Sequence, residues 1–245
     1  MFNFGFKKVN EEEKQKLVSS VFSSVSSKYD VMNNVMSFGV QKLWKKNFID
    51  LISLKQGGVF LDLACGSGDI TELVLKKAEA ENKEIFIVMC DENENMLNLA
   101  KKRFENFTNI EFVHSGAEDL PFEENKFDGV FISFGIRNFT NIEKSLKALK
   151  FCLKEGGSLF ILEFFSDVSK ILGFNKIYKT YVLKGIPLLG KIIVKDENSY
   201  RYFGESILNF YSKGDFKNLL QKAGFKFFAK VDSLFEIVGF FHFKK

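Results

Sequence analysis

The sequence predicts an α/β protein: a Rossmann-like sheet of about seven strands, mostly parallel with an antiparallel edge strand, plus N-terminal helices and a helical lid insertion. Three observations predict this fold. A strand, a glycine turn and a helix follow one another near residue 60, apolar runs then alternate with helical patterns, and two closely spaced apolar runs lie near the C-terminus. The 245 residues, 46% of them hydrophobic, are enough for a single domain, which we expect to span 1–245.

The first part of the chain, 1–55, is predicted to be helical. Asn10 and Glu13 resemble a capping box, and an apolar stripe typical of an amphipathic helix follows them. A second helical segment covers about residues 38–51 and contains the only tryptophan, Trp44. These helices precede the alternating pattern and stand outside it.

The core of the domain, 56–164, alternates strands with helices, which favours a parallel, doubly wound sheet. The strands are expected at residues 59–63, 85–90, 110–113, 129–133 and 158–164, and the helices at about 71–81, 95–104 and 142–153.

An insertion, 165–205, interrupts this rhythm. It is rich in aliphatic residues, tyrosines and lysines, and we expect amphipathic helices that form a lid over the carboxyl ends of the strands. The C-terminal part, 206–245, returns to the sheet. It is expected to contain a helix at 215–223 and an antiparallel pair of strands at 225–231 and 237–243.

The most informative motif is V-F-L-D-L-A-C-G-S-G-D-I-T, residues 59–71. Gly66 and Gly68 let a ligand approach the backbone, as in nucleotide-binding turns. Thr71 stands where a dinucleotide fingerprint would have its third glycine. Asp62 and Asp69 would repel a diphosphate and attract a sulfonium group. The motif therefore favours S-adenosylmethionine over a nicotinamide dinucleotide.

Further candidate contacts follow the next strands. Asp91 ends the second strand, where an acid accepts hydrogen bonds from a ribose diol. The turn S-G-A-E-D-L-P-F, with Gly116 and Ala117, follows the third strand and is suited to flank an adenine. Arg137 follows the fourth strand, where a guanidinium could stabilise a developing oxyanion. Only three arginines occur in the chain, so each is expected to be needed for its planar fork.

Composition excludes several classes. The net charge of +4 comes with dispersed lysines, so we expect no nucleic-acid partner. The two histidines and three cysteines form no cluster or C-x-x-C pair, so we expect no metal site and a reducing compartment. We find no signal pattern and no uninterrupted apolar run of about 18 residues, so we expect a cytoplasmic protein.

Four segments together resemble the ubiquinone/menaquinone biosynthesis C-methyltransferases, a family of class I S-adenosylmethionine-dependent methyltransferases. They are Y-D-V-M-N-N-V-M-S-F-G (29–39), L-D-L-A-C-G-S-G-D-I-T (61–71), S-F-G-I-R-N (133–138) and N-S-Y-R-Y-F-G-E-S-I (198–207). The resemblance runs over nearly the whole chain. It implies transfer of a methyl group to a ring carbon of a polyprenyl benzoquinol, a demethylmenaquinol, or both.

The resemblance also implies site residues. The family's cofactor contacts would fall on Thr71, Asp91, Gly116, Ala117 and Ser133, and Asp62, Gly66 and Gly68 complete the turn. Where the family has a histidine and an asparagine, this chain has Gln41 and Gly116, so a histidine base is excluded at position 41.

For catalysis we expect Arg137 and Arg201 to favour ionisation of a quinol hydroxyl, with Tyr200 and Asp30 as polar partners. The polyprenyl tail implies contact of the lid with the surface of the inner membrane. The resemblance is also compatible with a homodimer or with a quinone-biosynthesis assembly.

Three alternatives stay open at this point. Another class I methyltransferase, acting on a different lipid or a small phenol, would share the glycine motif but would not explain Y-D-V-M-N. A nicotinamide oxidoreductase is disfavoured by Thr71. A non-catalytic subunit of a quinone-synthesis complex would keep the fold and lose the cofactor contacts, whereas the glycine turn and Asp91 are intact.

Overall fold

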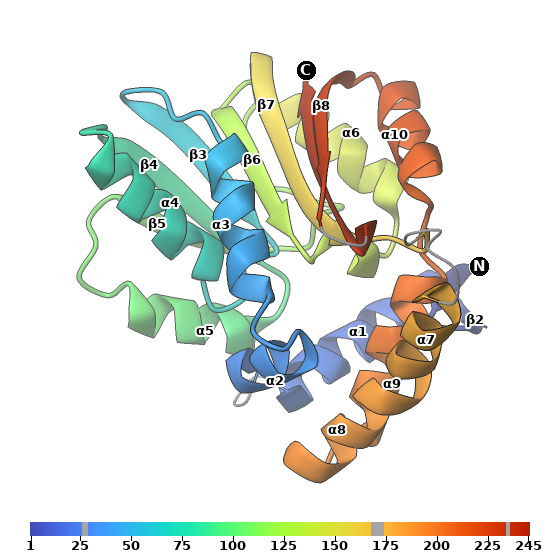
Figure 1. The fold of residues 1–245 in the computed structure, drawn as a ribbon. Helices are drawn as coiled ribbons and strands as arrows, with labels where there is room; N and C mark the ends of the chain where they lie inside the picture. Colours follow the sequence, from blue (N-terminus) through green and yellow to red (C-terminus); the bar gives the residue numbers. More distant parts are fainter. Residues whose placement is uncertain (26–28, 168–173, 234–235) are drawn as a thin grey trace.

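The computed structural model describes residues 1–25, 29–167, 174–233 and 236–245, and it has a sheet between two layers of helices (Figure 1). The seven strands lie in the order β5-β4-β3-β6-β7-β9-β8. They are β3 (Gly58–Leu63), β4 (Ile85–Asp91), β5 (Ile110–His114), β6 (Phe127–Ser133), β7 (Leu153–Phe164), β8 (Lys226–Asp232) and β9 (Val238–Lys244). The first five are parallel, and β9 runs antiparallel to both β7 and β8. The predicted fold class is confirmed.

Helices cover both faces of the sheet because the central strands are apolar on both sides. Phe60 and Phe131 face α3 (Gln41–Leu51), α4 (Asp69–Ala80) and α5 (Glu94–Arg103). On the opposite face Leu61 and Val130 pack in the core shared with α6 (Ile142–Cys152) and α10 (Lys213–Lys222). The strands and these helices lie within a few residues of their predicted positions.

The N-terminal region contains one element that was not predicted. A hairpin of β1 (Phe2–Phe4) and β2 (Lys7–Val9) precedes α1 (Glu11–Val25). Strands of three residues are too short to show an alternating pattern, which explains the omission. The cap of α1 is as expected, since the Glu13 amide donates to Asn10 Oδ1 over 2.8 Å.

The insertion folds into α7 (Phe174–Thr180), a π-helical turn (Tyr181–Gly185), α8 (Ile186–Ile193) and α9 (Glu197–Leu208). Together with α1 and α2 (Tyr29–Met36), these helices lie beyond the carboxyl ends of the parallel strands (Figure 1). They form a core of their own, which contains Val25, Met32, Met36, Tyr178, Val182, Ile186 and Tyr200. In the described parts of the chain, no helix combines the length and apolar content needed to cross a bilayer.

Candidate active site

Two adjoining cavities lie between the carboxyl end of the sheet and the helices beyond it. The glycine-loop cavity, about 710 Å³, is lined by Gly66, Asp91, Ala117, Ser133 and residues of α1. The aromatic cavity, about 990 Å³, is lined mainly by apolar and aromatic side chains of α1, α3, the sheet and the insertion. Phe22, Phe134 and Asn138 line both cavities, so the two meet there.

The two glycines of the loop between β3 and α4 serve different purposes. Both have positive φ, 55° at Gly66 and 90° at Gly68. A Cβ added to Gly66 would meet no atom within 4 Å, so the backbone there is open to a ligand. At Gly68 it would lie 2.4 Å from the ring of Phe104 and 2.8 Å from Met89. Gly68 therefore allows α5 to pack closely on the loop, and it does not line the cavity.

Asp91, at the tip of β4, ties the glycine loop to the next strand. Its Oδ2 accepts from the Gly66 amide and its Oδ1 from the Asn93 amide, each over 2.8 Å. Burial raises the pKa of Asp91, and these two hydrogen bonds act in the opposite direction. The carboxylate is thus held rigidly at the wall of the cavity.

Asp62 and Thr71 lie beneath the loop and do not line the cavity. Thr71 donates both its hydroxyl, over 2.7 Å, and its amide, over 3.2 Å, to Asp62 Oδ2. Burial raises the pKa of Asp62 to about 7, against these hydrogen bonds. The expected direct contact of Thr71 with a ligand is not what the geometry shows, because its hydroxyl already has a partner. The pair joins β3 to the start of α4.

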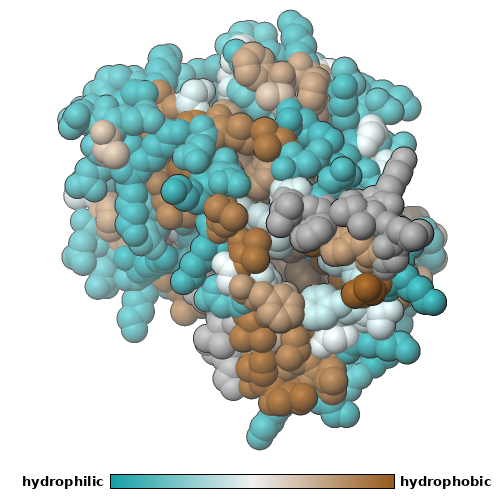
Figure 2. Space-filling model, in the orientation of Figure 1, coloured by the Kyte–Doolittle hydropathy of each residue, from teal (hydrophilic) through white to brown (hydrophobic). Residues whose placement is uncertain are grey.

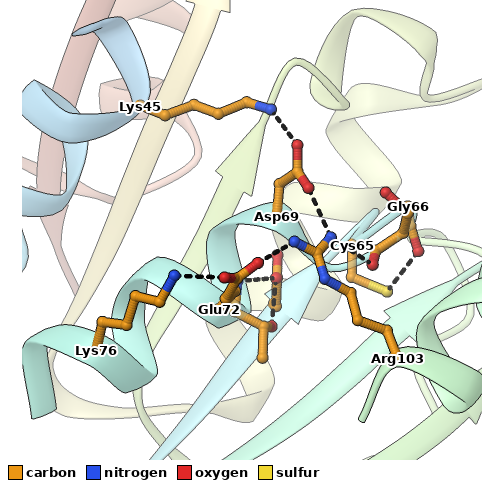
Figure 3. Close-up of polar contacts among 10 residues, drawn as sticks. Lys45, Cys65, Gly66, Asp69, Glu72, Lys76 and Arg103 are labelled. Atoms are coloured by element: carbon orange, nitrogen blue, oxygen red, sulfur yellow. Dashed lines mark hydrogen bonds and ion pairs between the residues drawn. The ribbon is translucent and has the colours of Figure 1, made fainter. Parts of the chain in front are cut away.

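The outer side of the loop carries a network of charges (Figure 3). Asp69 pairs with Lys45 over 2.5 Å and with Arg103 over 2.7 Å, and Arg103 also pairs with Glu72. Burial tends to raise the pKa of Asp69, but Lys45 and Arg103 outweigh it and hold that pKa below its usual range. This position does not support the expectation that Asp69 attracts a sulfonium group, because two cations already pair with its carboxylate.

The turn after β5 and the last residue of β6 supply the remaining predicted contacts. Ala117 lines the cavity, whereas Gly116 does not; an added Cβ on Gly116 would lie 3.5 to 3.7 Å from the carboxylates of Glu118 and Glu92. Ser133 lines the cavity, and its buried Oγ has no hydrogen-bond partner among the residues that the structure describes. A buried hydroxyl without a partner is costly, so this atom is suited to a ligand.

Arg137 supplies a buried positive charge to the aromatic cavity. It lies in the 3₁₀ turn Ile136–Asn138, forms an ion pair with Glu163 of β7, and donates from Nε to Ser206 Oγ over 2.9 Å. Burial raises the pKa of Glu163, and Arg137 opposes that shift. The planar fork thus bridges two elements, as expected for an arginine in a chain that has few.

The charge of Arg137 affects the pKa values of two tyrosines that line the cavity. Burial raises the pKa values of Tyr178 and Tyr202, and the charge of Arg137 lowers both. A phenolic hydroxyl bound in the same cavity would experience the same two effects.

Tyr200 and Arg201 point in different directions. Tyr200 is buried and lines the aromatic cavity. The side chain of Arg201 is 54% exposed and pairs with Glu197 over 2.5 Å. Neighbouring residues on a helix point about 100° apart, so Arg201 can face solvent although Tyr200 beside it faces the cavity. The prediction that Arg201 acts on the substrate is not supported by this position, and Arg137 is the arginine of the cavity.

Sequence reasoning missed several lining residues. Phe22 comes from α1, and no local pattern showed that this helix closes over both cavities. Asn138 and Tyr202 lie within motifs that were noticed, S-F-G-I-R-N and N-S-Y-R-Y, but they were not singled out. The helical period of α9 was the available signal for Tyr202, because Tyr202 lies three residues after Ser199 and so on the same side of the helix.

The comparisons with known proteins agree with this geometry. A family model described as the ubiE/COQ5 methyltransferase family matches residues 7–242. The chain belongs to this family. The resemblance found in the sequence is thereby confirmed.

Several relatives of this methyltransferase carry the same name. The ubiquinone/menaquinone biosynthesis C-methyltransferase UbiE of Francisella tularensis subsp. novicida (strain U112) is 42% identical over 226 residues, which cover 91% of this chain and 88% of that protein. The protein of the same name from Escherichia coli O1:K1 / APEC is 40% identical over 227 residues, with the same coverage of both chains.

Solved methyltransferase structures share the fold. A SAM-dependent methyltransferase from Aquifex aeolicus is 17% identical, with a TM-score of 0.56 and coverage of 97% of this chain and 99% of that one. Another from Thermotoga maritima is 18% identical, with a TM-score of 0.61 and coverage of 92% and 99%. At these identities the likeness concerns the fold alone.

The raised pKa of Asp62 predicts a pH-dependent stability for this methyltransferase. The folded state binds the proton more tightly than the unfolded state, so the stabilisation is full below an unfolded pKa of about 4 and is lost as pH rises through about 7. Asp62→Asn cannot ionise and keeps an acceptor for Thr71. We expect the stability of the wild type relative to this variant to fall from about pH 5 to pH 7 and to level off above that, measured by urea denaturation.

Asp69→Asn is the matched control. The lowered pKa of Asp69 keeps this group ionised in both states over the same range, so the difference from the wild type should stay flat. An Asp62→Asn variant that parallels the wild type at every pH would contradict the assignment.

Proposed function

We propose that the protein transfers a methyl group from S-adenosylmethionine to a ring carbon of a polyprenyl quinol in ubiquinone or menaquinone biosynthesis. The acceptor is a benzoquinol, a demethylmenaquinol, or both. The observation that carries this proposal is the meeting of two unlike cavities: one with buried carboxylate and hydroxyl groups around an open glycine, the other apolar with a single buried arginine. The names of the relatives support the same acceptor class.

The residues of the glycine-loop cavity fit S-adenosylmethionine. The unpartnered Ser133 Oγ offers a hydrogen bond, and Gly66 leaves its backbone open. A carboxylate has about four acceptor positions, so Asp91 retains two for a ribose diol after accepting from two amides. When bound, this cofactor supplies a methyl group on a positively charged sulfur, which keeps the electron pair of the broken bond.

Asp91→Ala is expected to weaken S-adenosylmethionine binding about 10- to 100-fold, because charge-assisted hydrogen bonds contribute about 1.5–3 kcal/mol each. Isothermal titration calorimetry measures this. Asp69→Ala, which removes an acid from the same loop on its outer side, should bind within about threefold of the wild type after correction for folded fraction. Equal losses in the two variants would contradict the role of Asp91.

Arg137 would promote ionisation of the acceptor. A quinol hydroxyl titrates near pH 10, like tyrosine, and the apolar cavity would raise its pKa further. Arg137 opposes this. Its Nε donates to Ser206 and its Nη1 to Glu163, whereas its Nη2 donates to no residue in the described parts of the chain. An ionised oxygen pushes electron density onto the neighbouring ring carbon, which is the nucleophile. The aromatic walls exclude water and orient the ring.

Arg137→Lys is expected to lower kcat about 100-fold with little change in S-adenosylmethionine affinity, because a lysine loses the fork that faces Glu163 and Ser206. Turnover is followed by mass spectrometry of the methylated quinol and of S-adenosylhomocysteine.

Arg201→Lys is the matched control, with the same change at an exposed arginine, and should turn over like the wild type. A wild-type enzyme that methylates neither quinol would contradict the proposed function. An Arg201→Lys variant as impaired as Arg137→Lys would contradict only the choice of arginine.

The lid is proposed to touch the surface of the inner membrane, where a polyprenyl tail would lie. Hydrophobic side chains gather on the end of the molecule where α8 lies (Figure 2). Ile177, Leu188 and Ile192 are 69%, 55% and 68% exposed, and lysines 176, 184 and 191 occur in the same segment. Exposed apolar groups among lysines favour anionic lipid.

Ile192→Glu is expected to reduce co-sedimentation with anionic liposomes several-fold, because a carboxylate is repelled by the lipid surface and exposes less apolar area. Phe228→Glu, at a position 61% exposed on β8, is the control and should bind like the wild type. No binding of the wild type to anionic liposomes would contradict the membrane contact.

A further inference from the structure

Asn138 lies where the two cavities meet. It ends the 3₁₀ turn that follows β6, its side chain is buried, and it lines both cavities. The other two residues shared by the cavities, Phe22 and Phe134, are apolar. Of the three residues that line both cavities, Asn138 is therefore the one with a polar side chain, and it lies where a methyl donor and an acceptor would meet.

The amide of Asn138 has a defined orientation. The hydroxyl of Tyr202 donates to Asn138 Oδ1 over 2.9 Å. Burial raises the pKa of Tyr202, so this hydroxyl keeps its proton and acts as the donor. With the oxygen occupied, Nδ2 carries the free donors of the amide, and it donates to no protein atom within the ranges that the structure describes.

Tyr202 is itself held from outside the site by the N-terminal hairpin. The ring of Phe4 stacks on that of Tyr202, with centroids 4.1 Å apart and planes 13° from parallel. The hairpin is fastened to α9, because the Phe6 amide donates to Glu205 Oε2 over 3.2 Å and Asn209 Nδ2 donates to the Gly5 carbonyl over 2.7 Å. The position of the Asn138 amide is therefore fixed by packing that extends to the chain's first residues.

We propose that Asn138 is a catalytic residue whose Nδ2 donates a hydrogen bond to the acceptor oxygen that becomes the phenolate, and that Tyr202 is the positioning residue that aims it. The inference rests on the proposed function. An amide fixed before the substrate binds stabilises negative charge without reorganising during the reaction.

Arg137 alone does not meet this need, because much of its charge faces Glu163. The two neighbouring residues would divide the task. Arg137 provides the positive field, and Asn138 provides a directional hydrogen bond at the junction of the cavities. A hydrogen bond to an ionised oxygen is about twice as strong as one to a neutral hydroxyl, so it favours the phenolate.

The test measures kcat against pH for the wild type and for Asn138→Ala, Asn138→Asp and Tyr202→Phe. Losing one oxyanion donor costs about 10²–10³-fold in kcat, so we expect a loss near 100-fold for Asn138→Ala. The limb of the profile that rises with pH should move upward by about one pH unit. Asn138→Asp, nearly equal in shape, should lose more because its carboxylate repels the phenolate. Tyr202→Phe should show a smaller shift in the same direction.

Two controls separate catalysis from folding. S-adenosylmethionine titration of each variant reports whether the fold is intact. Tyr202→Phe leaves the Asn138 side chain present and removes only the hydroxyl that orients it, so it creates no cavity at position 138. Tyr211→Phe removes a phenolic hydroxyl on a residue that lines neither cavity, and it should match the wild type.

An unmoved pH limb in Asn138→Ala and Asn138→Asp would overturn the proposal, even with lowered kcat, because a purely structural role would lower kcat at all pH values alike. Unchanged kcat would also overturn it. A wild-type enzyme inactive on both quinols would instead overturn the proposed function.

Discussion

The buried ion pair between Arg137 and Glu163 is the interaction on which the acceptor side of this site depends. Glu163 is fully buried in β7, and an isolated carboxylate there would be strongly destabilising. Removing one partner of such a pair costs about 3–5 kcal/mol. The pair holds the turn after β6 against β7, and through Ser206 it reaches α9. The aromatic cavity forms beside this ion pair. Arg137 lines the cavity because its pairing with Glu163 holds it there.

Three aspartates around the glycine loop show how environment separates chemically identical groups. Asp69 has two cationic partners and stays ionised. Asp62 accepts from the hydroxyl and the backbone amide of Thr71 and has no cationic partner in the described part of the chain, so burial dominates and its pKa rises to about 7. Asp91 accepts from two amides and faces the cavity. One is therefore a surface anchor, one an internal support, and one a group available to a ligand.

Much of the fold was predictable because its signals are local. Apolar runs, helical periods and the cap at Asn10 are set by neighbouring residues, and the strands and helices of the sheet lie within a few residues of their expected positions. The β1–β2 hairpin was not predictable, because its strands are short and its stability comes from contacts with α9. The same reason applies to Phe22, whose helix is far in sequence from the loop that it covers.

The fold class, the family and the end of the sheet where polar residues gather were all predictable from the sequence. Which of the candidate residues face a cavity became clear only from the three-dimensional packing: Asp91 and Ser133 do, whereas Thr71 and Arg201 do not. The physical reason is that a motif places residues along one chain, while the direction of a side chain depends on the partners that other elements bring to it. Gly68 is the simplest example. Its place in the motif suggested contact with a ligand, but in the fold its backbone packs against the ring of Phe104.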